Sequence, residues 1–167
     1  PGYPGLRTVA TSELTIQGGG SLTVYGGELV SAVTQVGGVY GVGSPAAIGS
    51  MQDQGFGTIN IHSGTITATG KSGTGAGIGG GWGSTGGTIK ITGGTVKASG
   101  GPNNGQGAAG IGSGFHGQVD SITITGGTIE ATGSNMGAGI GLGGSSRGLT
   151  EDRYSIKITG GNITAEA

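Results

Sequence analysis

One segment recurs along this chain, and the recurrence constrains the fold more than any other feature. Set in register, four copies read "TINIHSGTITATG" from Thr58, "TIKITGGTVKASG" from Thr88, "SITITGGTIEATG" from Ser121 and "SIKITGGNITAEA" from Ser155. A degenerate copy, "LTIQGGGSLTVYG", starts at Leu14. The chain therefore consists largely of one structural unit used several times.

A second motif returns between these copies as "AAIGS", "AGIGG", "AGIGS" and "AGIGL". Its marker isoleucines are Ile48, Ile78, Ile111 and Ile140, at spacings of 30, 33 and 29 residues. A period in this range is typical of solenoids, propellers and other repeat arrays.

Each repeat contains two short strands separated by a glycine-rich bend. Residues 59–61 and 66–68 alternate apolar and polar side chains, as strands with one buried face do. The marker motif supplies a third strand, and no hairpin turn separates the three. The pattern predicts an all-β fold, a single-stranded right-handed parallel β-helix of about four to five coils with three short strands per coil.

Stacking the coils predicts columns of inward side chains, spaced by about 4.8 Å. The expected columns are Ile59/Ile89/Ile122/Ile156, Ile61/Ile91/Ile124/Ile158, Ile66/Val96/Ile129/Ile163, Ala68/Ala98/Ala131/Ala165 and Ile48/Ile78/Ile111/Ile140. Lys97 and Glu130 should face each other on the outside.

Composition is consistent with this fold and excludes several others. The chain has 46 Gly among 167 residues, but only 9% of residues are charged and 32% are hydrophobic, which is not the composition of a disordered chain. Glycine does not fall at every third position, which excludes collagen. The net charge of −1 gives no reason to expect nucleic acid or a membrane as a partner. Cysteine is absent, so disulfides and thiolate chemistry are excluded.

The repeat also divides the chain. We expect a lead-in or linker over residues 1–13 and the β-helix module over residues 14–167, with an irregular first coil that carries an insert at about 26–45. The final copy stops after its second strand without a polar cap. Because solenoid ends need capping, we expect a module taken from a longer chain or an end packed on something else.

Two of the seven aromatic residues fall in one predicted corner. Trp82 and Phe115 each lie four residues after a marker isoleucine, on adjacent coils. Hydrogen-bonding residues surround them. The predicted carbohydrate-binding residues are Trp82, Phe115, His116, Gln52, Asp53 and Gln54. The alternative interpretation is that both aromatic side chains fold back over glycine backbone.

Catalysis is not expected, and no catalytic residue is assigned. Glycoside hydrolysis needs two facing carboxylates, and lyase chemistry needs a base with calcium or arginine. No two of the eight carboxylates fall on adjacent coils of one outward face, and Asp53 and His116 share a column two coils apart. We expect no cofactor. Calcium stays possible, and the sequence leaves metal binding unknown.

The string "GGTIKITGGTVKASGG…GAAGIGSG" resembles the glycine-rich β-helical repeats of bacterial extracellular carbohydrate-binding proteins, and more specifically the xylan-binding parallel β-helix modules attached to gut-bacterial xylanases. The similarity covers residues 58–167 well and residues 14–57 loosely. It implies an extracellular, secreted or cell-surface module that binds plant cell-wall polysaccharide, above all xylan, and targets a catalytic domain of the same polypeptide to it. The resemblance implies no particular binding residue, because the repeat itself is structural.

Three other functions stay open. A structural or adhesive β-solenoid segment, such as a surface stalk or phage fibre, is the main alternative. A polysaccharide lyase or hydrolase shares the fold, and the outward threonines are typical of ice-binding solenoids, although charged residues interrupt them.

Overall fold

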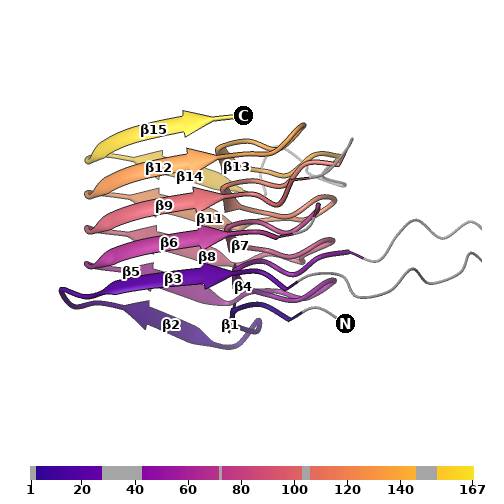
Figure 1. The fold of residues 1–167 in the computed structure, drawn as a ribbon, viewed down its shortest axis with the longest axis horizontal. Coiled ribbons are helices and arrows are strands. Elements are labelled where there is room, and N and C mark those ends of the chain that lie inside the picture. Colours follow the sequence, from indigo (N-terminus) through magenta and orange to yellow (C-terminus); the bar gives the residue numbers. More distant parts are fainter. Residues whose placement is uncertain (1–2, 28–42, 72, 103–105, 146–153) are drawn as a thin grey trace, which may run out of the picture.

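The computed structural model describes residues 3–27, 43–71, 73–102, 106–145 and 154–167, which contain fifteen β-strands. The described residues include no helix, and so none that could cross a membrane. Three parallel five-stranded sheets form the walls of a solenoid in which each coil gives one strand to each sheet (Figure 1).

Each sheet holds strands of one kind, in coil order. Sheet A is β1 (Leu6–Arg7), β4 (Ile48–Gly49), β7 (Ile78–Gly79), β10 (Ile111–Gly112) and β13 (Ile140–Gly141). Sheet B is β2 (Glu13–Ile16), β5 (Thr58–Ile61), β8 (Thr88–Ile91), β11 (Ser121–Ile124) and β14 (Ser155–Ile158). Sheet C is β3 (Ser21–Tyr25), β6 (Thr65–Thr69), β9 (Thr95–Ser99), β12 (Thr128–Thr132) and β15 (Asn162–Glu166).

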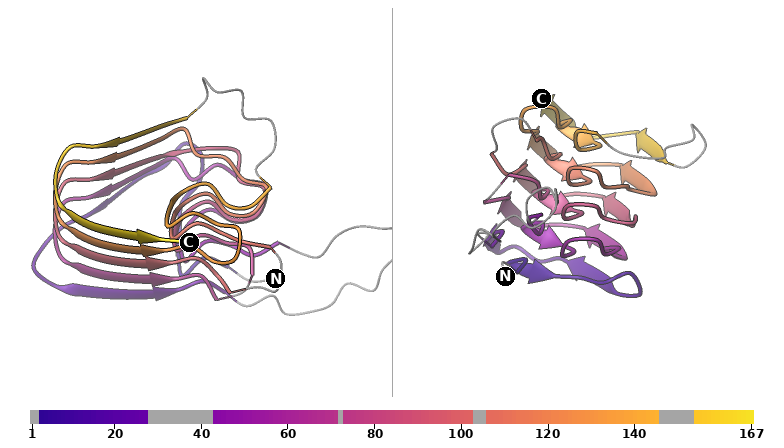
Figure 2. Two further views of the ribbon diagram at one scale, coloured as in Figure 1. Left: turned by 90° about the horizontal axis from the view of Figure 1, so that it is seen from above. Right: turned by 90° about the vertical axis from the view of Figure 1, so that its right-hand side faces the viewer.

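The coils wind in a right-handed sense. In Figure 1 the strands of sheet C run to the right in front and those of sheet B run to the left behind, while the chain rises from N to C. Figure 2 shows the same rotation from above. This is the hand that right-twisted strands favour for a parallel crossover. The predicted fold class is confirmed.

The predicted columns are confirmed by the strand register. Ile89 pairs with Ile59 on one side and Ile122 on the other, and the remaining columns follow the same rule in all three sheets. The inward side chains of the three middle coils are between 0% and 1% exposed and form one continuous core. The degenerate first copy joins this register, with Leu14 beneath Ile59 and Leu22 beneath Ile66.

The outward pair of Lys97 and Glu130 is also present. Their Nζ and Oε1 atoms lie 2.6 Å apart, and both side chains are more than half exposed. An exposed pair of this kind contributes at most about 1 kcal/mol. The core columns, rather than surface charges, therefore stabilise the solenoid.

Strand β1 and the buried Phe56 are two features of the first coils that the repeat pattern does not predict. Leu6 and Arg7, within the stretch expected as a lead-in, form β1 and pair with Ile48 and Gly49. Most of the expected insert, residues 28–42, lies outside the described residues. Phe56, which the repeat pattern does not predict, is fully buried, and its ring occupies the space that a side chain at Gly87 would need.

The first prediction tests the columns. Replacing Ile89 with Ala should lower the free energy of unfolding by about 2–5 kcal/mol, because it leaves a cavity between two neighbouring coils. Lys90→Ala, at the adjacent outward position, should change the same quantity by about 0.5 kcal/mol or less. Urea denaturation followed by circular dichroism measures both. Equal effects would contradict the assignment of inward and outward faces.

Candidate functional site

The candidate site is the connection between sheets A and B, which we call the aromatic corner and define as residues 52–54, 82–83, 115–116 and 144–145. It repeats in successive coils. The backbone N–H groups of Trp82, Phe115 and Gly144 donate to the carbonyls of Ser44, Thr74 and Gly107, one coil earlier in each case. Trp82 and Phe115 thus occupy equivalent places on adjacent coils, as the spacing predicts.

The residue that follows each of these three, and the one that follows Gln52 one coil earlier, has a positive φ angle and turns the chain. The φ angles are 56° at Asp53, 63° at Gly83, 58° at His116 and 50° at Ser145. The N–H groups of the first three donate to the carbonyls of Trp82, Phe115 and Gly144, one coil later. Non-glycine residues adopt this conformation rarely, and here the stacked neighbours hold three of them in it. The corner is therefore a rigid backbone ladder whose side chains can vary.

The two aromatic residues differ in exposure. Trp82 is half-buried, whereas Phe115 is only 6% exposed, and a Cβ atom built on Gly144 would lie 3.4 Å from both Phe115 Cδ2 and Met136 Cε. The sequence predicts a step built from Trp82 and Phe115. In the structure Phe115 presents little of its ring to solvent, so Trp82 supplies most of the exposed aromatic surface of the corner.

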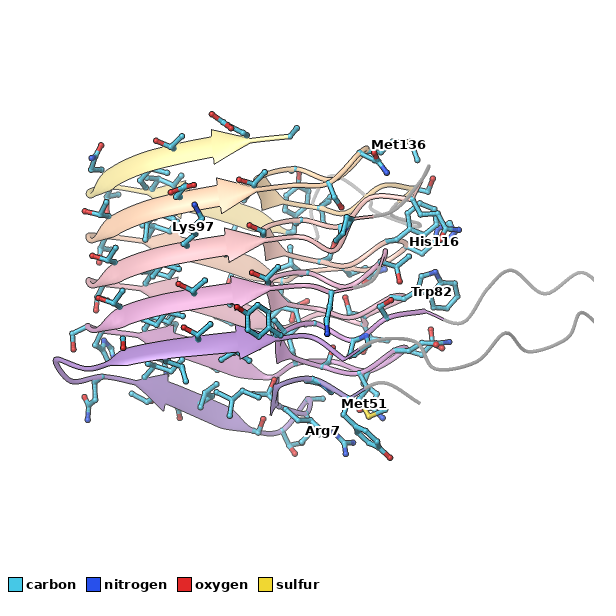
Figure 3. All side chains as sticks on the ribbon, viewed as in Figure 1. Arg7, Met51, Trp82, Lys97, His116 and Met136 are labelled. Atoms are coloured by element: carbon cyan, nitrogen blue, oxygen red, sulfur yellow. The ribbon has the colours of Figure 1, made fainter. Side chains whose placement is uncertain are left out.

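His116 contacts both aromatic rings. Its ring meets Trp82 edge-on, with centroids 5.8 Å apart and an interplanar angle of 87°, and lies 4.1 Å from the Phe115 centroid. Its Nδ1 is 2.6 Å from the carbonyl oxygen of Ser145. Because a carbonyl can only accept, Nδ1 carries a proton, and Nε2 is the nitrogen left for other partners. Figure 3 shows Trp82 and His116 one above the other at the same end of the coils.

The inner part of Trp82 covers glycine backbone. A Cβ atom built on Gly43 would lie 2.8 Å from Trp82 Cδ2 and still nearer to Trp82 Cβ and Cγ. The sequence offers the alternative interpretation that the aromatic side chain covers glycine backbone. That interpretation holds for the Cβ, Cγ and Cδ2 atoms of Trp82. The rest of Trp82 is accessible and lies outside the buried core cluster.

The predicted polar residues have different roles. Gln52 accepts from the Gly43 N–H at 3.0 Å and donates from Nε2 to Asp53 Oδ2 at 3.0 Å, so it links the corner to the neighbouring chain segment. The second carboxylate oxygen of Asp53, Oδ1, lies over Gly83, the residue that follows Trp82 in the chain. Gln54 accepts from the Arg7 guanidinium at 3.4 Å. Of the three, only Asp53 is shown to contact the coil that carries Trp82, through its N–H to the Trp82 carbonyl and its Oδ1 over Gly83.

Sequence reasoning missed several residues of this corner. Gly43 and Arg7 belong to segments outside the regular repeat, so periodicity does not bring them to the corner. Met136 lies before its marker isoleucine, on the segment that packs against Phe115. The positive φ positions can be located from the sequence, because each lies five residues after a marker isoleucine. They are Asp53, Gly83, His116 and Ser145.

The described residues contain no cluster of three or more His, Asp or Glu side chains that could hold a metal ion. The corner instead combines one indole, one imidazole and one carboxylate. This set can stack on an apolar ring face and exchange hydrogen bonds with hydroxyl groups.

The second prediction tests the geometry of the corner. Gly83→Ala should lower the free energy of unfolding by about 1–2 kcal/mol, because its φ of 63° suits glycine and its new Cβ would strike Asp53 Oδ1. Gly19→Ala is the matched control, since Gly19 has open space around it and no positive φ. It should change stability by about 0.5 kcal/mol or less. Thermal denaturation of both variants measures the difference, and equal melting temperatures would contradict the assigned turn.

Comparison with known proteins gives one match. The model of a family described as Beta helix repeat matches residues 59–82, 89–115 and 122–144. Each match runs from the first inward isoleucine of β5, β8 or β11 to the aromatic corner of the next coil. No curated protein and no solved structure matches the chain. The repeat in the sequence and the coil in the structure are thus the unit that this family model describes.

Proposed function

We propose that this β-helix repeat protein is a non-catalytic, extracellular carbohydrate-binding module that uses the aromatic corner to bind plant cell-wall polysaccharide. The observation that carries the proposal is the position of Trp82. The only tryptophan of the chain lies at the surface of a rigid corner, outside the core, beside an imidazole and a carboxylate.

Trp82 suits a sugar ring because its indole offers a flat apolar surface while polar groups surround it. The C–H face of a pyranose stacks on an aromatic ring, and its hydroxyls need donors and acceptors at the rim. Asp53 Oδ1 can accept from a hydroxyl, and His116 Nε2 can accept or donate. The Gln52 and Ser145 contacts hold these two side chains in place before a ligand arrives.

Xylan is the polysaccharide that the glycine-rich repeats indicate, through their resemblance to xylan-binding modules. The spacing between coils also favours a linear polymer as the ligand. Successive coils lie about 4.8 Å apart, roughly the length of one pyranose ring, so a chain that follows the solenoid axis meets one coil with each sugar. A catalytic domain of the same polypeptide is the partner that this function requires.

The third prediction tests the binding surface. Trp82→Ala should weaken binding to xylo-oligosaccharides about 30-fold, which corresponds to roughly 2 kcal/mol for the loss of an aromatic anchor. Its melting temperature should change little, because Trp82 is outside the core. Isothermal titration against xylo-oligosaccharides, with thermal melts alongside, gives both quantities.

Two further variants complete this test. Tyr25→Ala is the matched control, because Tyr25 is an aromatic residue, 59% exposed, at the end of β3 in sheet C, whereas the corner connects sheets A and B. It should bind as the unchanged protein does. Asp53→Asn keeps the shape of the side chain but weakens its acceptor oxygen, and should reduce affinity without loss of fold. Undiminished binding by Trp82→Ala would place the site elsewhere.

The fourth prediction concerns catalysis. Incubation with xylan, pectin or glucan should release no reducing ends and no unsaturated products, because the corner offers one carboxylate and not a facing pair. Product analysis by chromatography checks this. Turnover that survives repurification and disappears in Asp53→Ala would show that the chain is an enzyme.

A structural or adhesive segment is the second candidate function, because a continuous parallel ladder of stacked coils can serve as a stalk without binding a ligand. A carbohydrate array separates the two candidates, because a purely structural solenoid should bind none of the immobilised glycans.

A further inference from the structure

Two polar side chains flank the coil that carries Trp82, one from each side. Asp53 lies one coil earlier and His116 one coil later, and both occupy the positive φ position of the corner. On the Trp82 coil this position is Gly83, which has no side chain to separate Asp53 from His116. The backbones of Asp53 and His116 are about 9–10 Å apart, twice the spacing of neighbouring coils.

Both side chains reach toward the coil between them. The Oδ1 atom of Asp53 occupies the space that a Cβ atom on Gly83 would need. From the other side, the ring of His116 contacts the indole of Trp82, with centroids 5.8 Å apart and the rings nearly perpendicular (Figure 3). The Trp82 coil is thus contacted by one polar side chain from each neighbouring coil.

The free polar atoms of these two side chains are both hydrogen-bond acceptors. The carboxylate of Asp53 has no proton to donate, and Gln52 Nε2 already donates to its Oδ2 at 3.0 Å, which leaves Oδ1 for another donor. In His116 the Nδ1 proton is directed to the Ser145 carbonyl oxygen at 2.6 Å, so Nε2 of the neutral imidazole accepts. A ligand that uses both atoms must therefore supply two donors.

We propose that the aromatic corner recognises one sugar unit through two neighbouring hydroxyl groups, one donating to Asp53 Oδ1 and the other to His116 Nε2. This inference rests on the proposed carbohydrate binding and identifies the part of the sugar that is recognised. Trp82 stacks on the apolar face of the ring, so the hydroxyls at the edge of the ring point to the rim of the site. The ligand unit is a pyranose whose C2 and C3 hydroxyls are both free.

This arrangement makes the substitution pattern of the polymer decisive. An internal unit of a 1,4-linked xylan chain has free hydroxyls at C2 and C3 alone. A substituent on either oxygen removes one donor and leaves an acceptor of the corner covered but unpaired, which costs more than the loss of a contact in water. The corner therefore selects unsubstituted stretches of the polymer.

The fifth prediction tests the two hydroxyl contacts with a ligand that has no other hydroxyl. Methyl 4-O-methyl-β-xylopyranoside imitates one internal unit, and fluorine in place of its C2 or C3 hydroxyl removes one donor with little change of shape. NMR titration follows the indole N–H signal of Trp82, which is unambiguous because the chain has a single tryptophan. Each fluorinated ligand should bind the unchanged chain about 3- to 10-fold more weakly than the parent glycoside, as the loss of one hydrogen bond predicts.

Two variants assign each hydroxyl to its partner. Asp53→Ala removes one acceptor, and His116→Asn removes the other, because Asn tolerates the positive φ of this position but is shorter than His. In each variant one fluorinated ligand should bind as well as the parent glycoside does, and it should be a different ligand in the two variants.

Asp120→Ala is the matched control, because it removes an exposed carboxylate outside the corner. Both fluorinated ligands should bind this variant as weakly as they bind the unchanged chain. Circular dichroism confirms that each variant is folded, and His116→Gln replaces His116→Asn if the latter is not.

Failure of this inference and failure of the proposed function give different results. If the unchanged chain binds the parent and either fluorinated ligand equally well, the two hydroxyl contacts are overturned although the corner still binds sugar. The same follows if both variants still discriminate against both fluorinated ligands. If neither the parent glycoside nor xylotriose shifts the Trp82 signal, carbohydrate binding at the corner is overturned, and this inference with it.

Discussion

The parallel backbone ladder between coils is the interaction on which the rest of this structure depends. It sets the spacing at which Ile lies on Ile and Ala on Ala, and it carries the aromatic corner from one coil to the next. The ladder also explains much of the glycine. Gly79 has a φ of 126°, and a Cβ there would strike the carbonyl oxygen of Gly112 on the next coil. Glycine thus allows the coils of sheet A to approach each other closely, and its abundance here specifies order rather than disorder.

The sequence predicts the core columns because the repeat period and the alternation of strands depend on the backbone alone. All five columns follow from aligning the repeats, and the structure contains them. The prediction does not extend to features outside the repeat. Phe56 fills space at Gly87, but it stands where the next two coils carry Gly86 and Val119, so alignment gives it no partner. Strand β1 is not predicted because Pro4 and Arg7 stand where the equivalent strands have alanine two residues before and glycine directly after the marker isoleucine.

The aromatic corner could be predicted only in part, for a different reason. Alignment places Trp82 and Phe115 on adjacent coils, but it does not determine the directions of their side chains. Phe115 is buried whereas Trp82 is only half-buried, and His116 contacts Phe115 and meets Trp82 edge-on. Trp82 also lies against Gly43, which belongs to the end of the irregular insert. Which ring reaches solvent therefore depends on contacts between residues that the repeat does not relate to one another.

The separation between scaffold and surface bears on the proposed binding function. Outward and corner positions tolerate Trp, Phe, Gln or Gly in one column because the inward columns and the ladder already hold the coil. A polysaccharide is itself a linear repeat, and several weak contacts on one polymer bind far more tightly than one contact does. Because this chain has a single tryptophan, firm attachment to a cell wall would require several such corners to be linked on one polymer.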